Sequence, residues 1–268
     1  MSEPTRSLMV AAAQVISGPE PAANLELVRR YAARAADDGA ELVVFPEATM
    51  ACVGTPVHAV AEPLDGAFAE GVRATAAECG LVLVVGMFEP APDGRVHNTL
   101  LTTGPGLVGG DAAYRKMHLF DAFGAKESAV VAPGSEIVTT TISTRSGVPA
   151  TLGLATCYDV RFADLFTALG RAGAELICLP ASWGDGPGKA QQWDLLTRAR
   201  AMDAQAWLVA AGQGWVPGQG TDPLGIGRSL VTDPLGQVHA QLGHEPGLLV
   251  TRIDLDVVAP IRARIPIL

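Results

Sequence analysis

The sequence predicts an α/β fold assembled from two similar halves. Apolar runs typical of strands alternate along the chain with amphipathic segments typical of helices, which is the order found in α/β domains. In addition, GAELVVFPEATM from Gly39 resembles GAELICLPASWG from Gly173. Each copy follows a helix-like stretch, and the copies are 134 residues apart in a chain of 268. This spacing favours two related helix-strand units, and therefore two packed sheets with helices outside; convergence on common strand-ending chemistry is the alternative.

The strands are expected where short apolar runs are bounded by glycine, proline or charged residues. The first covers residues 8–14; a signal peptide is not expected there, because the apolar part is at the short limit of about 7 residues and Glu3 is out of place. The other predicted strands cover residues 41–45, 81–88, 98–103, 109–115, 137–142, 151–156, 207–211, 227–231, 238–242 and 248–253, with one more in the second copy of the repeat.

Helices are expected where apolar residues recur at helical spacing. They cover residues 20–38, 66–79, 162–169 and 189–203. Prolines at its entry and a glycine beyond its end delimit the first of them. The last is expected to place Leu195, Ala199 and Met202 on one apolar face. Residues 120–133 are irregular, residues 213–225 form a loop rich in glycine and proline, and a short tail begins at residue 254.

The composition predicts one domain that spans residues 1–268. A hydrophobic content of 49% is enough for a sizeable core, and no linker rich in serine, proline or charge divides the chain. Its 19 basic and 28 acidic residues give a net charge of −9 without a basic cluster, so nucleic acid and anionic membranes are not expected partners. No apolar run approaches the roughly 18 residues of a membrane span.

The four cysteines and five histidines favour neither a disulfide framework nor a metal site. The cysteines lack the CxxC spacing, and no two histidines are four residues apart. We therefore expect no metal and no cofactor, and the reducing cytoplasm is the predicted compartment.

Cys157 is the candidate nucleophile, because an apolar strand-like run stops there and a helix-like run follows. Backbone N–H groups left unpaired at such a junction, such as that of Tyr158, can point at a developing oxyanion. The local positive potential is expected to favour a thiolate. The alternative is a small buried side chain without a chemical role, since cysteine is among the most buried residue types.

Three further motifs are FPEATM with Glu47, YRKMHLFDAF with Lys116 and KESAVVAPG with Glu127. Together with CYDVRF around Cys157, and in this order, they resemble the carbon-nitrogen hydrolases of the nitrilase superfamily over nearly the whole chain. The resemblance implies a four-layer α-β-β-α sandwich. It also implies a catalytic triad of Glu47, Lys116 and Cys157, with Glu127 as a fourth active-site residue.

The residues themselves suggest roles for this set. Glu47 leaves a buried strand after a proline, where desolvation raises its proton affinity, so it is the predicted general base for the Cys157 thiol. Lys116 supplies positive charge for the thiolate and the tetrahedral oxyanion. Glu127 could position Lys116 or the substrate amine, or carry a proton. The predicted reaction forms a Cys157 thioester, releases ammonia, and ends with hydrolysis by a water that Glu47 activates.

The runs YRKMHLFDAF, PASWGDGPGKAQQW and LLTRARAMDAQAWLVAAG are most similar to the deaminated glutathione amidases. Omega-amidases that act on 2-oxoglutaramate are the nearest competitor, and another amidase, carbamoylase or nitrilase stays open. Both named substrates bear carboxylates, so a pocket arginine is expected to bind one, and Arg161 is the first candidate. A salt bridge from Arg161 to Asp159 or Asp164 is the alternative. Tyr158 and Trp183 complete the candidate oxyanion and substrate contacts.

Two other functions compete with this prediction. A Cys-His protease would use His118 as its base, and a binding scaffold would keep the fold without the reaction. The resemblance also implies a homodimer or larger assembly, through a face that carries residues 162–169. Many relatives have a His-Trp pair where this chain has Gln192 and Trp193, which leaves the hydrogen bonds around that pair open.

Overall fold

The computed structural model describes residues 6–217 and 225–268, and in these ranges the strands form two sheets. The first sheet has the strand order β13-β1-β2-β3-β4-β6, and the second has the order β12-β11-β10-β9-β8-β7-β5. The first comprises β1 (Ser7–Gln14), β2 (Leu42–Val44), β3 (Val82–Pro90), β4 (Val96–Thr103), β6 (Ala112–Arg115) and β13 (Gly247–Asp254). The second comprises β5 (Leu107–Val108), β7 (Thr139–Ser143), β8 (Pro149–Leu154), β9 (Leu176–Ala181), β10 (Trp207–Gly212), β11 (Leu230–Thr232) and β12 (Val238–Gln241).

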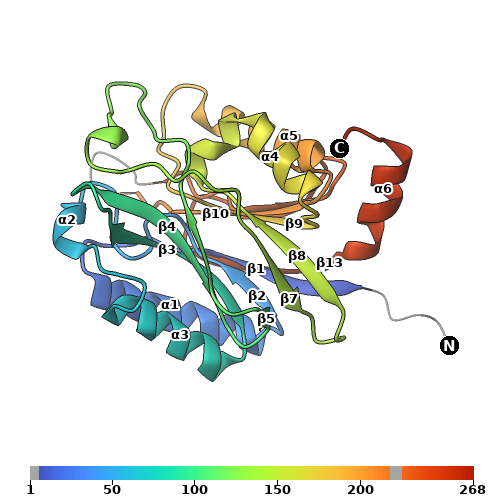
Figure 1. Ribbon diagram of the computed structural model, residues 1–268, viewed down its shortest axis with the longest axis horizontal. Helices are drawn as coiled ribbons and strands as arrows, with labels where there is room; N and C mark the ends of the chain where they lie inside the picture. Colours follow the sequence, from blue (N-terminus) through green and yellow to red (C-terminus); the bar gives the residue numbers. More distant parts are fainter. Residues whose placement is uncertain (1–5, 218–224) are drawn as a thin grey trace.

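The helices lie outside the two sheets (Figure 1). They are α1 (Pro21–Asp37), α2 (Val57–Val60), α3 (Ala67–Cys79), α4 (Ala163–Arg171), α5 (Lys189–Ala204) and α6 (Val258–Arg264), with 3₁₀ turns at Glu127–Ala129, Cys157–Arg161 and Leu255–Val257. Helices α1 and α3 cover the first sheet, and α4 and α5 cover the second.

Buried side chains fill all three spaces between these four layers. Because neighbouring residues of a strand face opposite sides, Val43 packs toward α1 and α3 while Leu42 and Val44 pack between the sheets. In the second sheet, Leu176 faces the first sheet and Ile177 faces α4 and α5. The strands are therefore buried on both faces, which explains their continuous apolar runs. The predicted α-β-β-α sandwich is confirmed.

The two copies of the sequence repeat occupy equivalent places. Strand β2 lies between the parallel neighbours β1 and β3, and β9 lies between the parallel neighbours β8 and β10. The helix before each copy ends two residues ahead of its glycine, and both Gly39 and Gly173 adopt positive φ, at 81° and 91°. Only glycine adopts this conformation without steric cost, which accounts for the repeated residue. The equivalent positions of the two copies favour the interpretation that they are two related helix-strand units.

Some predicted boundaries are wrong where glycines interrupt an apolar run. The strand predicted for residues 109–115 begins only at Ala112, because Gly109 and Gly110 both have a φ of 91°. Similarly, Gly227 has a φ of 66°, and strand β11 begins only at Leu230. The loop predicted for residues 213–225 is described at its ends alone, since residues 218–224 lie outside the described ranges.

The predicted face of helix α5 is also wrong. Leu195 and Met202 are 68% and 50% exposed, whereas Trp193 and Ala201 are fully buried. Small residues face inward because α4 and α5 lie close together: a Cβ on Gly170 would fall 2.5 Å from the Ala204 carbonyl oxygen. The tail predicted from residue 254 contains helix α6. Across the described residues, no helix combines the length and apolar character needed to cross a bilayer.

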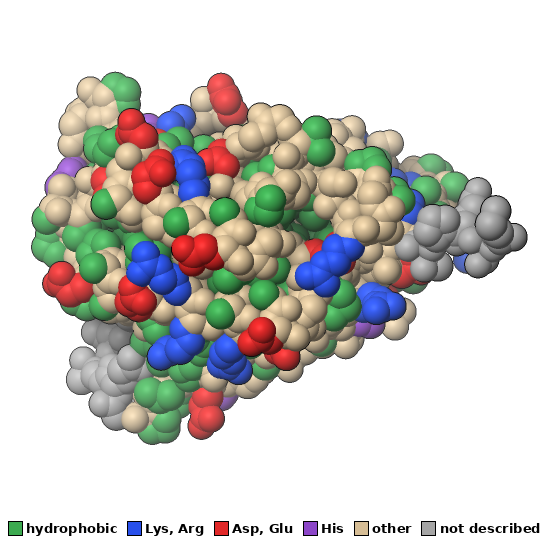
Figure 2. All heavy atoms as spheres, turned by 90° about the horizontal axis from the view of Figure 1, so that it is seen from below, with side chains coloured by type: hydrophobic (Ala, Val, Ile, Leu, Met, Phe, Trp, Pro, Cys, Tyr) green, Lys and Arg blue, Asp and Glu red, His purple; other side chains and the backbone are tan. Residues whose placement is uncertain are grey.

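The face formed by α1 and α3 carries basic and acidic side chains in alternation (Figure 2). Some of them form ion pairs within one helix turn, such as Arg73 with Glu70 at 2.7 Å. On this face no large area has charges of one sign.

Candidate active site

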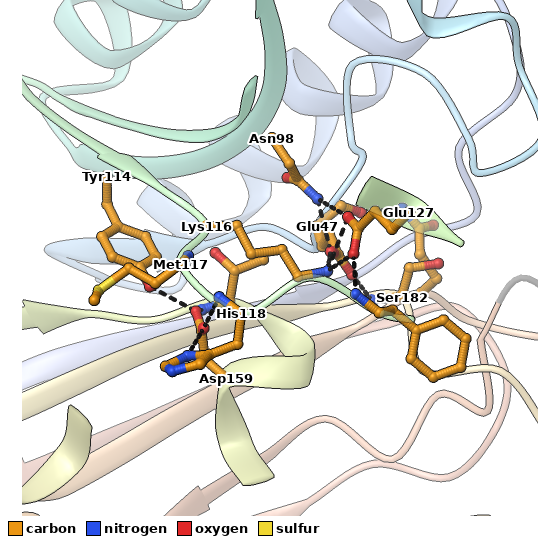
Figure 3. Close-up of polar contacts among 12 residues, drawn as sticks. Glu47, Asn98, Tyr114, Lys116, Met117, His118, Glu127, Asp159 and Ser182 are labelled. Carbon is orange, nitrogen blue, oxygen red and sulfur yellow. Dashed lines mark hydrogen bonds and ion pairs between the residues drawn. The ribbon is translucent and has the colours of Figure 1, made fainter. Parts of the chain in front are cut away.

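Three of the four predicted catalytic residues lie just after the end of a strand. Glu47 follows β2, Lys116 follows β6 directly, and Cys157 follows β8 at the start of a 3₁₀ turn. Glu127 opens another 3₁₀ turn in the irregular segment after Lys116. The structure brings Glu47, Lys116 and Glu127 into direct contact, although 80 residues of chain separate the first from the last (Figure 3).

Lys116 bridges the two carboxylates. Its Nζ donates to Glu47 Oε1 at 2.8 Å and to the two oxygens of Glu127 at 3.1 and 2.9 Å. The Lys116 side chain is only 2% exposed and that of Glu47 only 5%. A buried ammonium of this kind requires anionic partners, since the isolated charge would be strongly disfavoured. Lys116 and Glu47 are therefore buried partners of one ion pair and not solvated surface groups.

Asn98 and Ser182 complete the contacts of Glu47, and sequence reasoning missed both. Asn98 Nδ2 donates to Glu47 Oε1 at 2.8 Å and to Glu127 Oε1 at 3.3 Å. The Ser182 backbone N–H donates to Glu47 Oε2 at 2.9 Å. The sequence repeat could have located Ser182, because it stands one position after the counterpart of Glu47 in the second copy. No such signal exists for Asn98, because β4 reads VHNTLLTT and its polar neighbours His97 and Thr99 keep Asn98 from standing out.

The turn at Cys157 has a strained backbone. Cys157 has a φ of 46°, in the left-handed region that residues other than glycine rarely adopt. Two residues later, the fully buried Asp159 stabilises the turn. Its Oδ2 accepts from the Thr156 N–H at 2.8 Å, and its own N–H donates to the Thr156 carbonyl at 2.9 Å. This places the sulfur at the sharp strand-to-turn junction that the sequence indicated.

Asp159 also connects the Cys157 turn to the Lys116 segment. Its Oδ1 accepts from the His118 N–H at 3.0 Å and lies 2.7 Å from His118 Nδ1. Its Oδ2 accepts from the Tyr114 hydroxyl at 2.6 Å. The ring of His118 stacks on Phe162 with centroids 3.7 Å apart. His118 thus serves the packing of this region, and the carboxylate that acts on the pKa of the Cys157 thiol is that of Glu47.

Opposing effects set the pKa values of the reacting groups. Burial raises the pKa of Glu47, but the charge and hydrogen bond of Lys116 outweigh it, so the pKa lies below its ordinary value. For Cys157, burial and the negative charge of Glu47 raise the pKa of the thiol well above its ordinary value, and Lys116 offsets this only in part. Burial lowers the pKa of Lys116, but the charges of Glu47 and Glu127 raise it more.

The resting site therefore contains a Glu47 carboxylate, a Lys116 ammonium and a neutral Cys157 thiol. This corrects two expectations: the pKa of Glu47 is lowered rather than raised, and the turn does not favour a resting thiolate. For the Cys157 thiol, burial is the largest cause of the raised pKa, and the negative charge of Glu47 adds to it. The arrangement suits a thiol that transfers its proton to Glu47 as the sulfur attacks.

Comparison with known proteins gives the family. The model of the family described as "Carbon-nitrogen hydrolase" matches residues 9–263. The chain belongs to the carbon-nitrogen hydrolase family. It is therefore a hydrolase of carbon-nitrogen bonds other than peptide bonds, as the sequence resemblance predicted.

The relatives of this carbon-nitrogen hydrolase are similar over almost their whole length. "Hydrolase Rv0480c" of Mycobacterium tuberculosis is 51% identical over 97% of this chain and 94% of its own. "Deaminated glutathione amidase" of Escherichia coli O157:H7 is 32% identical over 97% and 96%. "Omega-amidase NIT2" of Xenopus tropicalis is 31% identical over 95% and 91%. Among solved structures, Saccharomyces cerevisiae Nit3, of the nitrilase superfamily, superposes with a TM-score of 0.80 at 26% identity, over 97% of this chain and 95% of its own.

The three candidate substrate residues of this carbon-nitrogen hydrolase also lie together. The Arg161 guanidinium carbon lies 5.5 Å from the Tyr158 ring centroid and 5.0 Å from that of Trp183. Arg161 forms no ion pair with Asp159 or Asp164, so that alternative is wrong; its Nη2 donates instead to Gln192 Oε1 at 2.7 Å. Gln192 therefore has a hydrogen-bonding role at the position where many relatives have histidine.

Proposed function

We propose that this enzyme is an amidase that hydrolyses the carboxamide of a small carboxylated substrate through a thioester on Cys157. The observation that carries the proposal is the buried Lys116, which joins Glu47 and Glu127 beside a neutral thiol. Deaminated glutathione is the preferred substrate candidate, supported by the similarity to enzymes of that name at 32% and 34% identity.

In the first step, the Cys157 sulfur attacks the amide carbon while its proton moves to Glu47 Oε. The negative charge that forms on the amide oxygen is stabilised by the Lys116 ammonium and by the Tyr158 backbone N–H. Glu47 then returns the proton to the departing nitrogen, which leaves as ammonia from a primary amide and as an amine from a secondary amide such as deaminated glutathione.

In the second step, a water loses a proton to Glu47 and attacks the thioester carbon. Collapse of the second tetrahedral intermediate expels the Cys157 sulfur, which recovers the proton from Glu47, and the carboxylic acid leaves. Glu127 keeps Lys116 in place through two hydrogen bonds, and it also accepts one from Asn98 Nδ2 at 3.3 Å and one from the Phe120 N–H at 2.5 Å. A substrate amine held beside Lys116 would also lie within reach of the Glu127 carboxylate.

Arg161 is the proposed partner of a substrate carboxylate. Its Nε is buried and has no hydrogen-bond partner among the described residues, although the guanidinium can donate five hydrogen bonds. A carboxylate is the ligand that this planar group binds best. An omega-amidase that acts on 2-oxoglutaramate is the second candidate function, supported by the relative of that name at 31% identity.

The test is a substrate panel compared by kcat/KM. It contains deaminated glutathione, 2-oxoglutaramate, acetamide, an N-carbamoyl amino acid and a nitrile. A site that pairs a carboxylate should reject analogues that lack it by several orders of magnitude, because its charge is then left unpaired. If acetamide or the nitrile is the best substrate, the substrate proposal is wrong.

We also propose a homodimer or larger assembly in the reducing cytoplasm. All four cysteines carry free thiols, which suits that compartment. On α4, however, Leu165, Phe166 and Leu169 are buried in the enzyme's own core. Phe162, just before α4, is 38% exposed, and Leu195 and Met202 on α5 are 68% and 50% exposed, so we place the partner surface at these three side chains.

A further inference from the structure

The Lys189 ammonium lies over aromatic rings. This residue begins helix α5, and its Nζ lies over three aromatic rings, at 4.2 Å from the Trp183 centroid, 5.4 Å from that of Phe120 and 5.5 Å from that of Phe123. Within residues 6–217 and 225–268, no carboxylate pairs with this ammonium and no oxygen accepts a hydrogen bond from it. Aromatic faces stabilise a cation, but they leave its three hydrogen-bond donors unused.

Arg161 is a second cation on the same ring. Its guanidinium carbon lies 5.0 Å from the Trp183 centroid, and its buried Nε has no partner in the described part of the chain. Burial lowers the pKa of Lys189, and the positive charge of Arg161 contributes to that lowering. Two cations that repel one another, and that form no ion pair with any carboxylate of the described residues, are suited to receive anionic groups from a ligand.

The aromatic platform under Lys189 adjoins the catalytic groups on two sides. Trp183 directly follows Ser182, whose N–H donates to Glu47 Oε2 at 2.9 Å. Phe120 donates its own N–H to Glu127 Oε2 at 2.5 Å. Cys157 is also close enough to Lys189 for a negative charge on its sulfur to raise the pKa of Lys189. A small substrate whose amide lies at Cys157 therefore extends over this platform.

The placement of lysine in this chain is selective. The sequence contains three lysines, and its other sixteen basic residues are arginines. Lys116 lies in the catalytic cluster, Lys189 lies on the Trp183 platform, and only Lys126 is exposed. Two of the three lysines thus lie within the active-site region.

We propose that Lys189 is a specificity-determining residue: its ammonium binds a second substrate carboxylate, in addition to the one that Arg161 binds. The preferred substrate class is then a small amide with two carboxylates. This inference rests on the proposed amidase function, and it separates deaminated glutathione, which has two carboxylates, from 2-oxoglutaramate, which has one.

The test compares the wild type with Lys189→Met, which keeps the aliphatic stem over Trp183 and removes the charge. Loss of a charge-assisted contact should raise KM for deaminated glutathione about 10- to 100-fold, with a much smaller change in kcat. The ratio of kcat/KM between deaminated glutathione and neutral propionamide should fall at least about 10-fold. Lys189→Arg should recover most of the loss, and Lys126→Met, an exposed lysine changed in the same way, should show none.

Binding measured by calorimetry separates failure of this inference from failure of the amidase function. In the Cys157→Ala background, which does not turn over, Lys189→Met should weaken binding of deaminated glutathione by the same factor. This arm gives a result even if the wild type hydrolyses none of the amides. Equal losses on neutral and carboxylated amides, or equal binding with and without Lys189, or no binding of deaminated glutathione at all, would overturn the proposal.

Discussion

The Tyr114 hydroxyl donates a hydrogen bond to Asp159 Oδ2 at 2.6 Å, and both side chains are buried. Tyr114 stands two residues before Lys116, and Asp159 stands two residues after Cys157. Burial, together with the charge of Asp159, raises the pKa of Tyr114 well above its ordinary value, so the hydroxyl remains a donor throughout the working pH range. This bond links the segment that carries the catalytic lysine to the turn that carries the nucleophile.

Removing the hydroxyl with Tyr114→Phe should lower kcat about 10-fold and leave KM nearly unchanged, because misplacement of a reacting group affects the chemical step. The free energy of unfolding should fall by roughly 1–3 kcal/mol, since the buried Asp159 loses a donor. Kinetics and urea unfolding measure the two effects. Tyr31→Phe, which removes the same atom from helix α1, is the control. Equal kcat values for the two variants would show that the link does not position the site.

The pH dependence of kcat/KM should reflect the lowered pKa of Glu47. Glu47 acts as a base only when ionised, and the charge of Lys116 keeps it ionised below its ordinary pKa of 4.5 despite burial. The acidic limb of the profile should therefore fall below pH 4.5. The same ion pair should stabilise the fold above this range and cease to do so as pH falls through the lowered pKa.

Asn98→Ala gives a matched variant for the pH profile. It removes a donor to Glu47 Oε1 without changing a charge, so the pKa of Glu47 and the acidic limb should move to higher pH. An acidic limb near pH 6 in the wild type, or a limb that Asn98→Ala leaves in place, would contradict the assigned base.

Glu127→Gln tests the second carboxylate of the cluster. The amide keeps the size of the side chain but removes a charge beside Lys116 and one of its acceptor oxygens. We expect kcat to fall by about 100-fold or more, in the range seen when a positioned catalytic group is lost. Circular dichroism and thermal unfolding should show that the fold persists. Activity within a few-fold of the wild type would reduce Glu127 to a structural partner of Lys116.

Much of the site could be predicted because strand ends and short motifs are local features. Glu47 after Pro46, Lys116 after β6 and Cys157 after β8 are each visible in the sequence around them. The pKa of Cys157 could not be predicted in the same way, since its direction depends on the distances to Glu47 and Lys116. Those distances are set by contacts between segments far apart in the chain.

The contacts of Asp159 and Lys189 also could not be predicted from the local sequence. Asp159 appeared only as a possible ion-pair partner of Arg161, but the fold directs it to Tyr114 and His118 instead. Lys189 appeared only as the first residue of a helix, and its ring contacts come from two segments far from one another in the chain. The prediction of helix α5 as a helix is correct, but the prediction of its buried face is wrong. That face was assigned from aliphatic residues alone, without the buried Trp193.

The assembly prediction concerns the exposed apolar side chains of α5. Light scattering at micromolar concentration should give at least about twice the chain mass of 27.7 kDa. Leu195→Asp should shift the assembly toward the monomer, because an unpaired charge in an interface is costly. Val108→Asp, at an exposed apolar residue of the edge strand β5, serves as the control. A wild-type mass of 27.7 kDa would refute the predicted assembly.

The most direct test of the proposed chemistry is to trap the acyl-enzyme. Deaminated glutathione is mixed with enzyme, quenched in acid within the first turnovers, and digested for mass spectrometry. The account predicts an acyl adduct on the peptide that contains Cys157, its absence in Glu47→Gln, and no turnover by Cys157→Ala, whereas Cys52→Ala, at a half-buried free thiol, should remain active. Turnover by Cys157→Ala at the wild-type rate, or an adduct on another residue, would contradict the central role of Cys157.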